Sequence, residues 1–305
     1  MDMTRTQYWQ NFQLGTELDV ACGFMYDGLR NLRDLHDFRE ESDVFPVLYN
    51  LAVGLERLLK VAVVLLEFTD ETDITAFEDD LRTHNHGELM RRVRKRVTVN
   101  LSPCHNEFIA LLATFYKSHR YDRFNLSSVS DAAKDKAAFL AFLGKHLRID
   151  VTDDGFFVYP GNSPRIRAFL GKVLRHIAIQ LYDIIRKAAQ AKGLYTHELR
   201  NGGKASKLLL EEDFSFASDD LVWKEVFLFL LNTRRRNGYK RFLKSIKPLD
   251  LDIAHLPDFL SVLRGEVQSD VAEQVETLWE ELDGPARKER MERLSLIGAP
   301  GVSFD

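Results

Sequence analysis

Glycine, proline and cysteine are scarce in this chain of 305 residues, which contains 17, 8 and 2 of them. Few helix breakers, together with 21 phenylalanines, favour long helices over short strands. The two cysteines, Cys22 and Cys104, cannot build a disulfide framework, and neither belongs to a CxxC pair of the kind that binds zinc. We therefore expect a reducing compartment and no structural metal.

The chain also lacks a strong net charge and an uninterrupted apolar span. Its formal net charge is −4, so the whole molecule is not a polycation of the kind that coats nucleic acid. The most apolar stretch, residues 45–68, is nearly long enough to cross a bilayer, but Glu56, Arg57 and Lys60 stand in its middle. The first residues lack the apolar core of a signal peptide. We therefore expect a cytoplasmic protein without a membrane partner.

Common cofactor and hydrolase motifs are absent as well. The sequence contains no GxxxxGK[ST], GxGxxG, GxSxG or HExxH. His84 and His86 flank Asn85, but without the strands and further ligands of a metal nuclease that carries these three letters. Histidines at this spacing do not share a helix face, so they are poor candidates for a common metal. We expect no metal site and no cofactor.

Apolar residues recur at helical spacing along most of the chain, which predicts a mainly all-α protein. The expected helices cover about 16–41, 45–68, 84–96, 106–116, 132–147, 164–192 and 221–231, with short amphipathic helices over 257–296. The period changes at 147–160, where LRIDV and FFVYP flank the turn TDDG and predict a short β-hairpin. This break divides the expected chain, near 149–163, into a helical bundle (1–150) and a second helical region (151–305) that begins with the hairpin.

Four segments carry a resemblance to a known family. They read LYNLAVGLERLLK at 48–60, HNHGEL at 84–89, FYKSHRYDRFNL at 115–126 and YTHELRNGGKASK at 195–207. Together they resemble a group of uncharacterised bacterial proteins within the HEPN superfamily of helical bundles. The matches span roughly 45–207, so the resemblance implies a HEPN-like bundle over most of the chain.

The resemblance also implies a function. HEPN ribonucleases use an Arg-x(4–6)-His motif, paired across a homodimer, to cut RNA without a metal. A histidine serves as general acid or base and an arginine stabilises the charge on the scissile phosphate. The expectation is thus an endoribonuclease in a bacterial toxin or antiviral-defence setting, with RNA as substrate, a second copy of the chain, and possible pairing with a partner protein of the same system.

The motif position itself departs from the family. Arg120 is followed by Arg123 and then by Asn125, which stands where the motif histidine is expected and cannot transfer a proton. His84, His86 or His119 could replace that histidine if the bundle brings one of them near Arg120. A purely structural network around Arg120 and Arg123 is the competing interpretation.

Two further sets of residues belong to this hypothesis. Glu56 and Arg57 lie in a helix too apolar to carry charges without a reason, and we expect one of them to reach the segment 120–125. The literal Arg-x5-His match is Arg30 and His36, which forms an alternative catalytic pair, although their side chains would point about 120° apart on an unbroken helix.

A basic run supports a second hypothesis, a non-catalytic module that binds nucleic acid or a protein. Residues 232–247 contain seven bases and no acid. Cations interleaved with aromatics can hold phosphates and stack bases, and the candidates here are Arg234, Arg235, Arg236, Lys240 and Arg241. A solvated face is the simpler interpretation. A third hypothesis is an assembly subunit whose apolar faces dimerise.

Overall fold

The computed structural model describes residues 4–122, 124, 126, 134–149, 161–194, 203–235, 237–265 and 269–299. These residues are mostly helical and form no strand, which confirms the all-α prediction for the part described. The expected β-hairpin falls on 150–160, outside the described residues. None of the described helices has both the length and the hydropathy that a membrane crossing requires.

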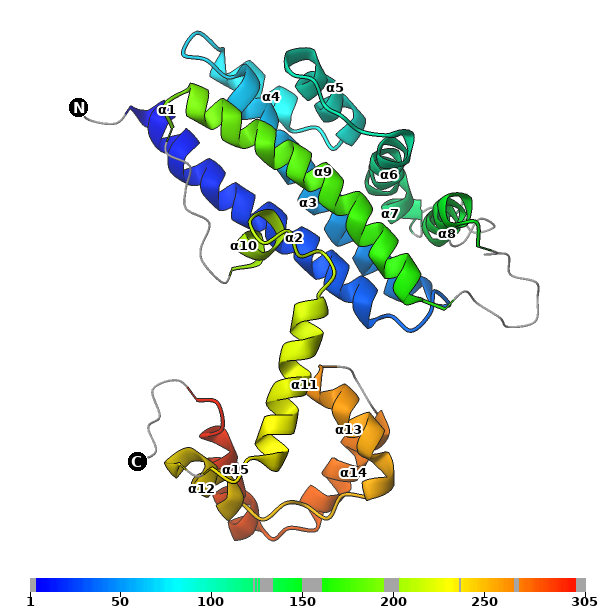
Figure 1. Ribbon diagram of the computed structural model, residues 1–305, viewed down its shortest axis with the longest axis vertical. Coiled ribbons are helices and arrows are strands. Elements are labelled where there is room, and N and C mark those ends of the chain that lie inside the picture. Colours follow the sequence, from blue (N-terminus) through cyan, green and yellow to red (C-terminus); the bar gives the residue numbers. More distant parts are fainter. Residues whose placement is uncertain are drawn as a thin grey trace. The chain divides into compact units, whose positions relative to one another are not determined.

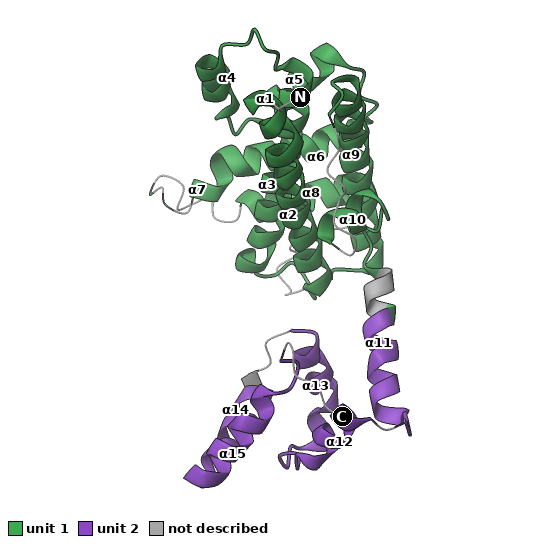
Figure 2. Ribbon diagram, turned by 90° about the vertical axis from the view of Figure 1, so that its left-hand side faces the viewer, with its two compact units in different colours: residues 1–221 green, residues 222–305 purple. Residues whose placement is uncertain are grey.

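The chain divides into two compact units, residues 1–221 and 222–305 (Figure 2). This division differs from the expected boundary at 149–163. The reason is that the helix beginning at Pro164 packs on the central helix of the first unit, so both sides of the expected boundary share one core. The described helices of the first unit are α1 (Arg5–Tyr8), α2 (Leu14–Asp34), α3 (Glu41–Glu67), α4 (Ile74–Leu81), α5 (His86–Arg96), α6 (Pro103–Thr114), α7 (Arg120–Asp122), α8 (Lys134–Leu147), α9 (Pro164–Ala191) and α10 (Lys204–Leu209).

The helix α3 is the centre of the first unit. It is apolar nearly all round, as the stretch 45–68 predicted, and it contacts α2, α5, α6, α8 and α9 (Figure 1). Gly54 lets α2 approach closely, because a Cβ atom there would lie 2.8 Å from the carbonyl oxygen of Ala21 and 2.6 Å from Cγ of Met25. The crossing of α2 and α3 therefore depends on a residue without a side chain.

Local signals fix where the helices around α3 begin. The Asn85 side chain accepts a hydrogen bond from the Glu88 amide, 3.2 Å away, and so caps α5. Ser102 and His105 form a reciprocal capping box at α6, and Ser163 precedes Pro164 at the start of α9. The sequence predicted starts at residues 84 and 106 for these two helices, each within three residues of the observed starts at His86 and Pro103.

Two π-helices interrupt the bundle of the first unit. The π-helix η1 (Trp9–Gln13) leads into α2, and η2 (Phe115–His119) joins α6 to α7. Each contains a widened turn with one more residue than a regular α-helical turn, a feature that is frequent at functional sites. Neither was visible in the helical periodicity, because a single extra residue barely disturbs the apolar pattern.

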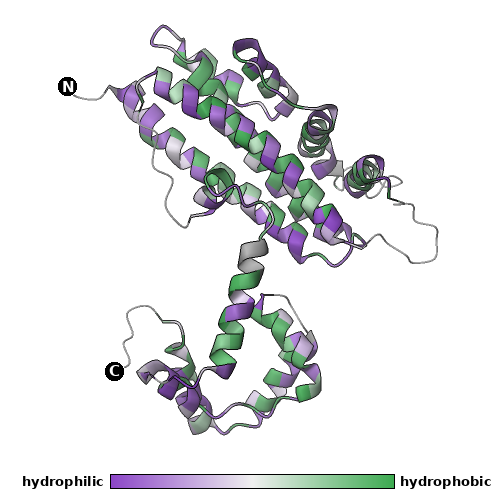
Figure 3. Cartoon of the chain, viewed as in Figure 1, coloured by the Kyte–Doolittle hydropathy of each residue, from purple (hydrophilic) through white to green (hydrophobic). Residues whose placement is uncertain are grey.

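The second unit consists of short helices. Its boundary lies inside α11 (Ala217–Asn232), and α12 (Gly238–Ser245), η4 (Ile253–His255), α13 (Leu256–Leu263), α14 (Ser269–Glu280) and α15 (Gly284–Ser295) follow. Arg290 of α15 donates to the carbonyl oxygen of Lys247 at 2.7 Å, which holds α15 near the end of α12. Apolar residues predominate over the described part of α11 (Figure 3), and several of them are exposed: Val222, Val226, Leu228, Phe229, Leu230 and Leu231.

Candidate functional site

The site is built on Glu56 in the middle of α3. Its side chain is only 8% exposed, and Lys60, one turn later on the same helix, donates to its Oε1 at 2.8 Å. Nδ1 of His84, in the loop before α5, lies 3.1 Å from Oε2 of the same carboxylate. Glu56 is therefore a buried carboxylate with two partners, as a charged group inside a helical core requires.

His84 is the accessible member of this group, since its side chain is 51% exposed. A carboxylate accepts, so the Glu56 bond selects the tautomer that carries its proton on Nδ1. Nε2 is then the unprotonated, basic nitrogen of the ring. An exposed imidazole oriented by a buried carboxylate is the arrangement that a general base needs.

Tyr116 connects the histidine to Arg120. The Tyr116 ring packs edge-on against His84, with 5.3 Å between the ring centroids. On the same ring the guanidinium carbon of Arg120 lies 3.7 Å from the centroid, and 4.5 Å from that of Tyr121. Burial raises the pKa of the Tyr116 hydroxyl, against the lowering effect of its hydrogen bond with Arg120. Tyr116 therefore remains a neutral platform for a cation near pH 7.

His86 has a structural place beside this platform. It is fully buried, its centroid lies 6.1 Å from that of Tyr116, and its Nε2 donates to the carbonyl oxygen of Ala52 at 2.8 Å. Burial lowers the pKa of His86, although the Ala52 carbonyl and the Glu56 carboxylate act in the opposite direction. A neutral, inaccessible imidazole holds α5 against α3 and is poorly placed to exchange protons with a substrate.

Several buried polar atoms around the platform lack a hydrogen-bond partner among the described residues. They are Nδ1 of His86, Nδ1 of His119 and Nε of Arg120. Native structures leave few such atoms unpaired, and each of them requires an explanation, such as strain, a bound water or ion, or a catalytic role. An Arg120 with an unpaired Nε can still donate to an incoming phosphate oxygen.

Arg57 and the alternative pair lie elsewhere. Arg57 donates to Glu17 of α2 at 2.5 Å, while Glu56 alone faces the platform that carries Arg120. Arg30 forms an ion pair with Asp34 of its own helix at 3.8 Å. His36 follows the end of α2, so the helix breaks between Arg30 and His36. Arg123 and Asn125 lie outside the described residues.

The basic segment belongs to the second unit and lies around the start of α12. Arg234 and Arg235 are exposed in the loop before this helix, and Arg241 is exposed on it. Lys240 donates to the carbonyl oxygen of Thr233, and Arg236 is outside the described residues. Tyr239 is used internally, because its hydroxyl accepts from the Gly298 amide at 3.0 Å. The segment thus offers exposed cations more readily than exposed aromatic rings.

Tyr116 is the residue that sequence reasoning missed. It stands one helical turn before Arg120, a spacing that brings a cation over a ring, and this signal was available in FYKSHR.

Among the described residues, no group of three or more His, Cys, Asp or Glu side chains could hold a metal ion. Comparison of the chain with protein-family models, curated proteins and solved structures returned no match.

Proposed function

We propose that the chain is a HEPN-type endoribonuclease that cuts RNA without a metal, in a bacterial toxin or antiviral-defence system. One observation supports this most: an exposed imidazole is oriented by a buried carboxylate, and both His84 and Arg120 contact the ring of Tyr116. The arrangement supplies a base and a phosphate-binding cation beside one platform. The nucleophile comes from the substrate, because RNA carries a 2′-hydroxyl.

The reaction runs through the neutral form of His84. Its Nε2 removes the proton of the 2′-hydroxyl while the 2′-oxygen forms a bond to phosphorus. The bond from phosphorus to the 5′-oxygen breaks, and the imidazolium returns the proton to that oxygen. The products are a 2′,3′-cyclic phosphate and a free 5′-hydroxyl, so no atom or electron is left over.

Arg120 and Glu56 have separate tasks in this scheme. Arg120 donates to the phosphate oxygens and stabilises the charge that grows on them. Glu56 orients the imidazole and stabilises its transient positive charge, and the hydrogen bond from Lys60 fixes this carboxylate in place. A homodimer would bring a second copy of each group to the same groove, as the family resemblance implies.

The experiment uses pure full-length protein, end-labelled RNA and excess EDTA. We expect cleavage products with a cyclic phosphate end, and a loss of about 100-fold or more in rate for His84→Ala and Arg120→Ala, since a general acid–base group and a donor that stabilises transition-state charge each contribute about this much. Cleavage that persists unchanged in both variants, with both proteins folded, would contradict the proposal.

A non-catalytic module that binds nucleic acid is the second candidate. The exposed cations Arg234 and Arg235 favour it, and so does Asn125 at the motif position. In that case RNA would bind without being cut, and binding would weaken steeply with salt.

A further inference from the structure

A pocket of the first unit lies away from the proposed ribonuclease site. It has a volume of about 400 Å³ and is lined by residues of α1, η1 and α4 and by Phe68, the C-cap of α3. Phe68 follows Glu56 by roughly 18 Å along the helix axis, at about 1.5 Å per residue. The volume falls within the roughly 300–1,000 Å³ of small-molecule sites. The pocket is therefore large enough for a ligand of its own.

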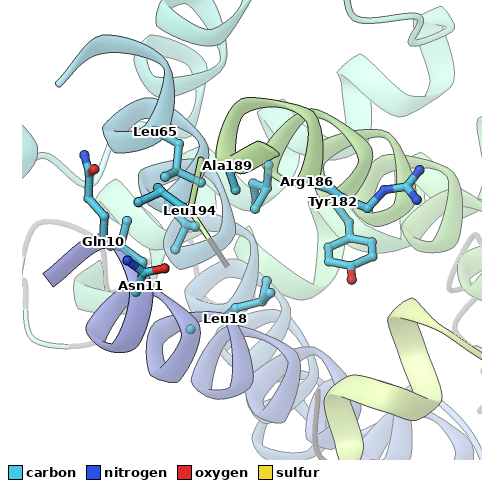
Figure 4. Close-up of a pocket in the computed structure, with 12 residues that line it drawn as sticks. Gln10, Asn11, Leu18, Leu65, Tyr182, Arg186, Ala189 and Leu194 are labelled. Atoms are coloured by element: carbon cyan, nitrogen blue, oxygen red, sulfur yellow. The ribbon is translucent and has the colours of Figure 1, made fainter. Parts of the chain in front are cut away.

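The N-terminal helices present one face to this pocket. Every fourth residue lines it, namely Arg5, Trp9 and Gln13, because steps of this length return to nearly the same side of a helix. Gln10 and Asn11, which lie between them, line a different hollow among α2, α3 and α9 (Figure 4). That hollow has a volume of only about 40 Å³, which is enough for water and too small for a metabolite.

Aromatic rings form much of the larger pocket. Trp9 packs edge-on with Phe68, with 5.2 Å between the ring centroids. Tyr8 lines the same pocket and is 54% exposed. The face of an aromatic ring is negative, so several rings around one space attract a cation. A quaternary ammonium group suits such walls better than a primary one, because it has no N–H groups that burial would leave unpaired.

Two opposite charges also line the pocket. Glu78 projects from α4 and Arg5 from α1, and both are exposed. Among the described residues, neither side chain forms an ion pair or a hydrogen bond, with the other or elsewhere. Glu78 is therefore free to attract a cation held by the rings, and Arg5 is free to bind a carboxylate or a phosphate. A ligand of a single charge would leave one of the two facing a like charge.

We propose that this pocket binds a small zwitterion that carries a quaternary ammonium group at one end and a phosphate or carboxylate at the other, as in phosphocholine. The ammonium group lies against Trp9 and Tyr8 beside Glu78, and the anionic end binds Arg5. The pocket is separate from the Tyr116 platform, so this binding is testable whether or not the chain cuts RNA.

The first test compares small probes by calorimetric titration of the full chain. Choline and 3,3-dimethyl-1-butanol have the same shape, but only choline is charged. Choline should bind at least about 5-fold more tightly, as cation–π contacts predict. Phosphocholine should bind at least about 5-fold more tightly than choline, because its phosphate reaches Arg5. Equal binding of choline and the alcohol, or inorganic phosphate that binds as tightly as phosphocholine, would overturn the proposal.

Variants assign each end of the ligand. Trp9→Leu and Glu78→Gln should each reduce the preference for choline over the alcohol, and Arg5→Gln should remove the advantage of phosphocholine over choline. Arg186→Gln is the matched control, since it removes the same charge beside the small hollow (Figure 4) and should leave binding unchanged. Circular dichroism verifies folding. Phosphocholine binding that is unaltered in both folded Glu78→Gln and folded Arg5→Gln would refute the assignment.

The same chemistry occurs in a free metabolite and in a lipid headgroup. Flotation with phosphatidylcholine vesicles, compared with phosphatidylglycerol vesicles, distinguishes these sources. Binding to phosphatidylcholine vesicles that Arg5→Gln abolishes would assign the pocket to a headgroup. Saturable binding of phosphocholine without flotation would assign it to the free molecule, and flotation with both kinds of vesicle that Arg5→Gln leaves unchanged would contradict a role for the pocket.

Discussion

Glu56 and His84 are joined by a bond of 3.1 Å between a buried carboxylate and a half-exposed imidazole. Lys60 holds the other carboxylate oxygen, so the acid cannot turn away from the histidine without losing a buried ion pair. The pair therefore has a fixed side in the core and an open side toward the surface. Our first prediction depends on this asymmetry.

Replacing the carboxylate should affect catalysis more than binding. In Glu56→Gln the amide is nearly the same size but cannot stabilise an imidazolium, and it can present its NH₂ group to Nδ1, which would favour the wrong tautomer. We expect the rate of RNA cleavage to fall by at least about 10-fold, with little change in RNA affinity. Single-turnover cleavage and a binding titration, both in EDTA, measure the two effects.

Glu88→Gln is the matched control for this substitution. Glu88 pairs with Arg91 on the exposed face of α5, away from the Tyr116 platform. The Glu88→Gln protein should cleave RNA at the rate of the unaltered protein. A Glu56→Gln protein as active as the Glu88→Gln protein would exclude a role for the carboxylate.

Stability should fall at mildly acidic pH. His105 accepts hydrogen bonds at Nδ1 from the amide of Ser102 at 3.1 Å, and its ring stacks on His176 at 4.3 Å, so its neutral form belongs to the fold. Burial, and secondarily His176, lower the pKa of His105 below 6.5. Burial likewise lowers the pKa of His86.

The sign follows from proton linkage. A histidine with a lowered pKa binds fewer protons in the folded state than in the unfolded state, so its contribution is fully present above about pH 6.5 and is lost as the pH falls through that value. The urea midpoint should therefore be lower at pH 5 than at pH 7.5. His105→Gln keeps a capping box with Ser102 but does not titrate, so it should reduce this difference; a midpoint equally pH-dependent in this variant would contradict the assignment.

Two glycines of the α2–α3 pair should respond in opposite directions to alanine. At Gly54 the new Cβ would meet backbone atoms of α2 at 2.8 Å and 2.9 Å, so Gly54→Ala should destabilise the protein by about 1–3 kcal/mol or more. At Gly23, within α2, nothing lies within 4 Å of an added Cβ, so Gly23→Ala should stabilise the helix by up to about 1 kcal/mol. Urea unfolding measures both, and destabilisation by Gly23→Ala would show that our account of this helix pair is wrong.

The basic segment makes a separate prediction for nucleic-acid binding. If Arg234 and Arg235 contact phosphates, their joint reversal to Glu should weaken RNA binding uniformly across sequences. The slope of the logarithm of the binding constant against the logarithm of the salt concentration is negative, and its magnitude should decrease by about 1.4, at roughly 0.7 per lost phosphate contact on single strands. Arg264→Glu, at the C-cap of α13, is the control for a change of charge alone. A slope that the double reversal does not alter would exclude this segment as the binding surface.

The helical framework could be predicted from the sequence because each signal is local. The apolar run at 45–68 gave α3, and Pro164 with Gly193 bracketed α9, where Gly193 has the left-handed φ of 65° that ends helices. The division of the chain was different. The turn residues at 149–163 could form either a loop within one domain or a linker between two domains. Only the packing of α9 on α3 shows that both sides of this stretch belong to one core.

The site was predictable in part, for similar reasons. A charge such as Glu56 inside an apolar helix requires a partner, and that requirement pointed to this part of α3. Which of His84 and His86 can act as the acid–base group depends on how deeply each side chain is buried. The sequence around two neighbouring histidines does not show this difference in burial. Arg57 had the same local pattern as Glu56 but pairs across the opposite face with Glu17.

The π-helix η2 connects the core of the first unit to Arg120. A widened turn is what remains when one residue is inserted into a helix whose two ends stay in place. Deleting one residue between Tyr116 and Arg120 would restore a regular turn while α6 and α7 kept their places, and the two side chains, then three residues apart, would still share a helix face. A single codon gained or lost within 115–119 is therefore a change that this bundle can absorb without losing its core or the contact between the ring and the arginine.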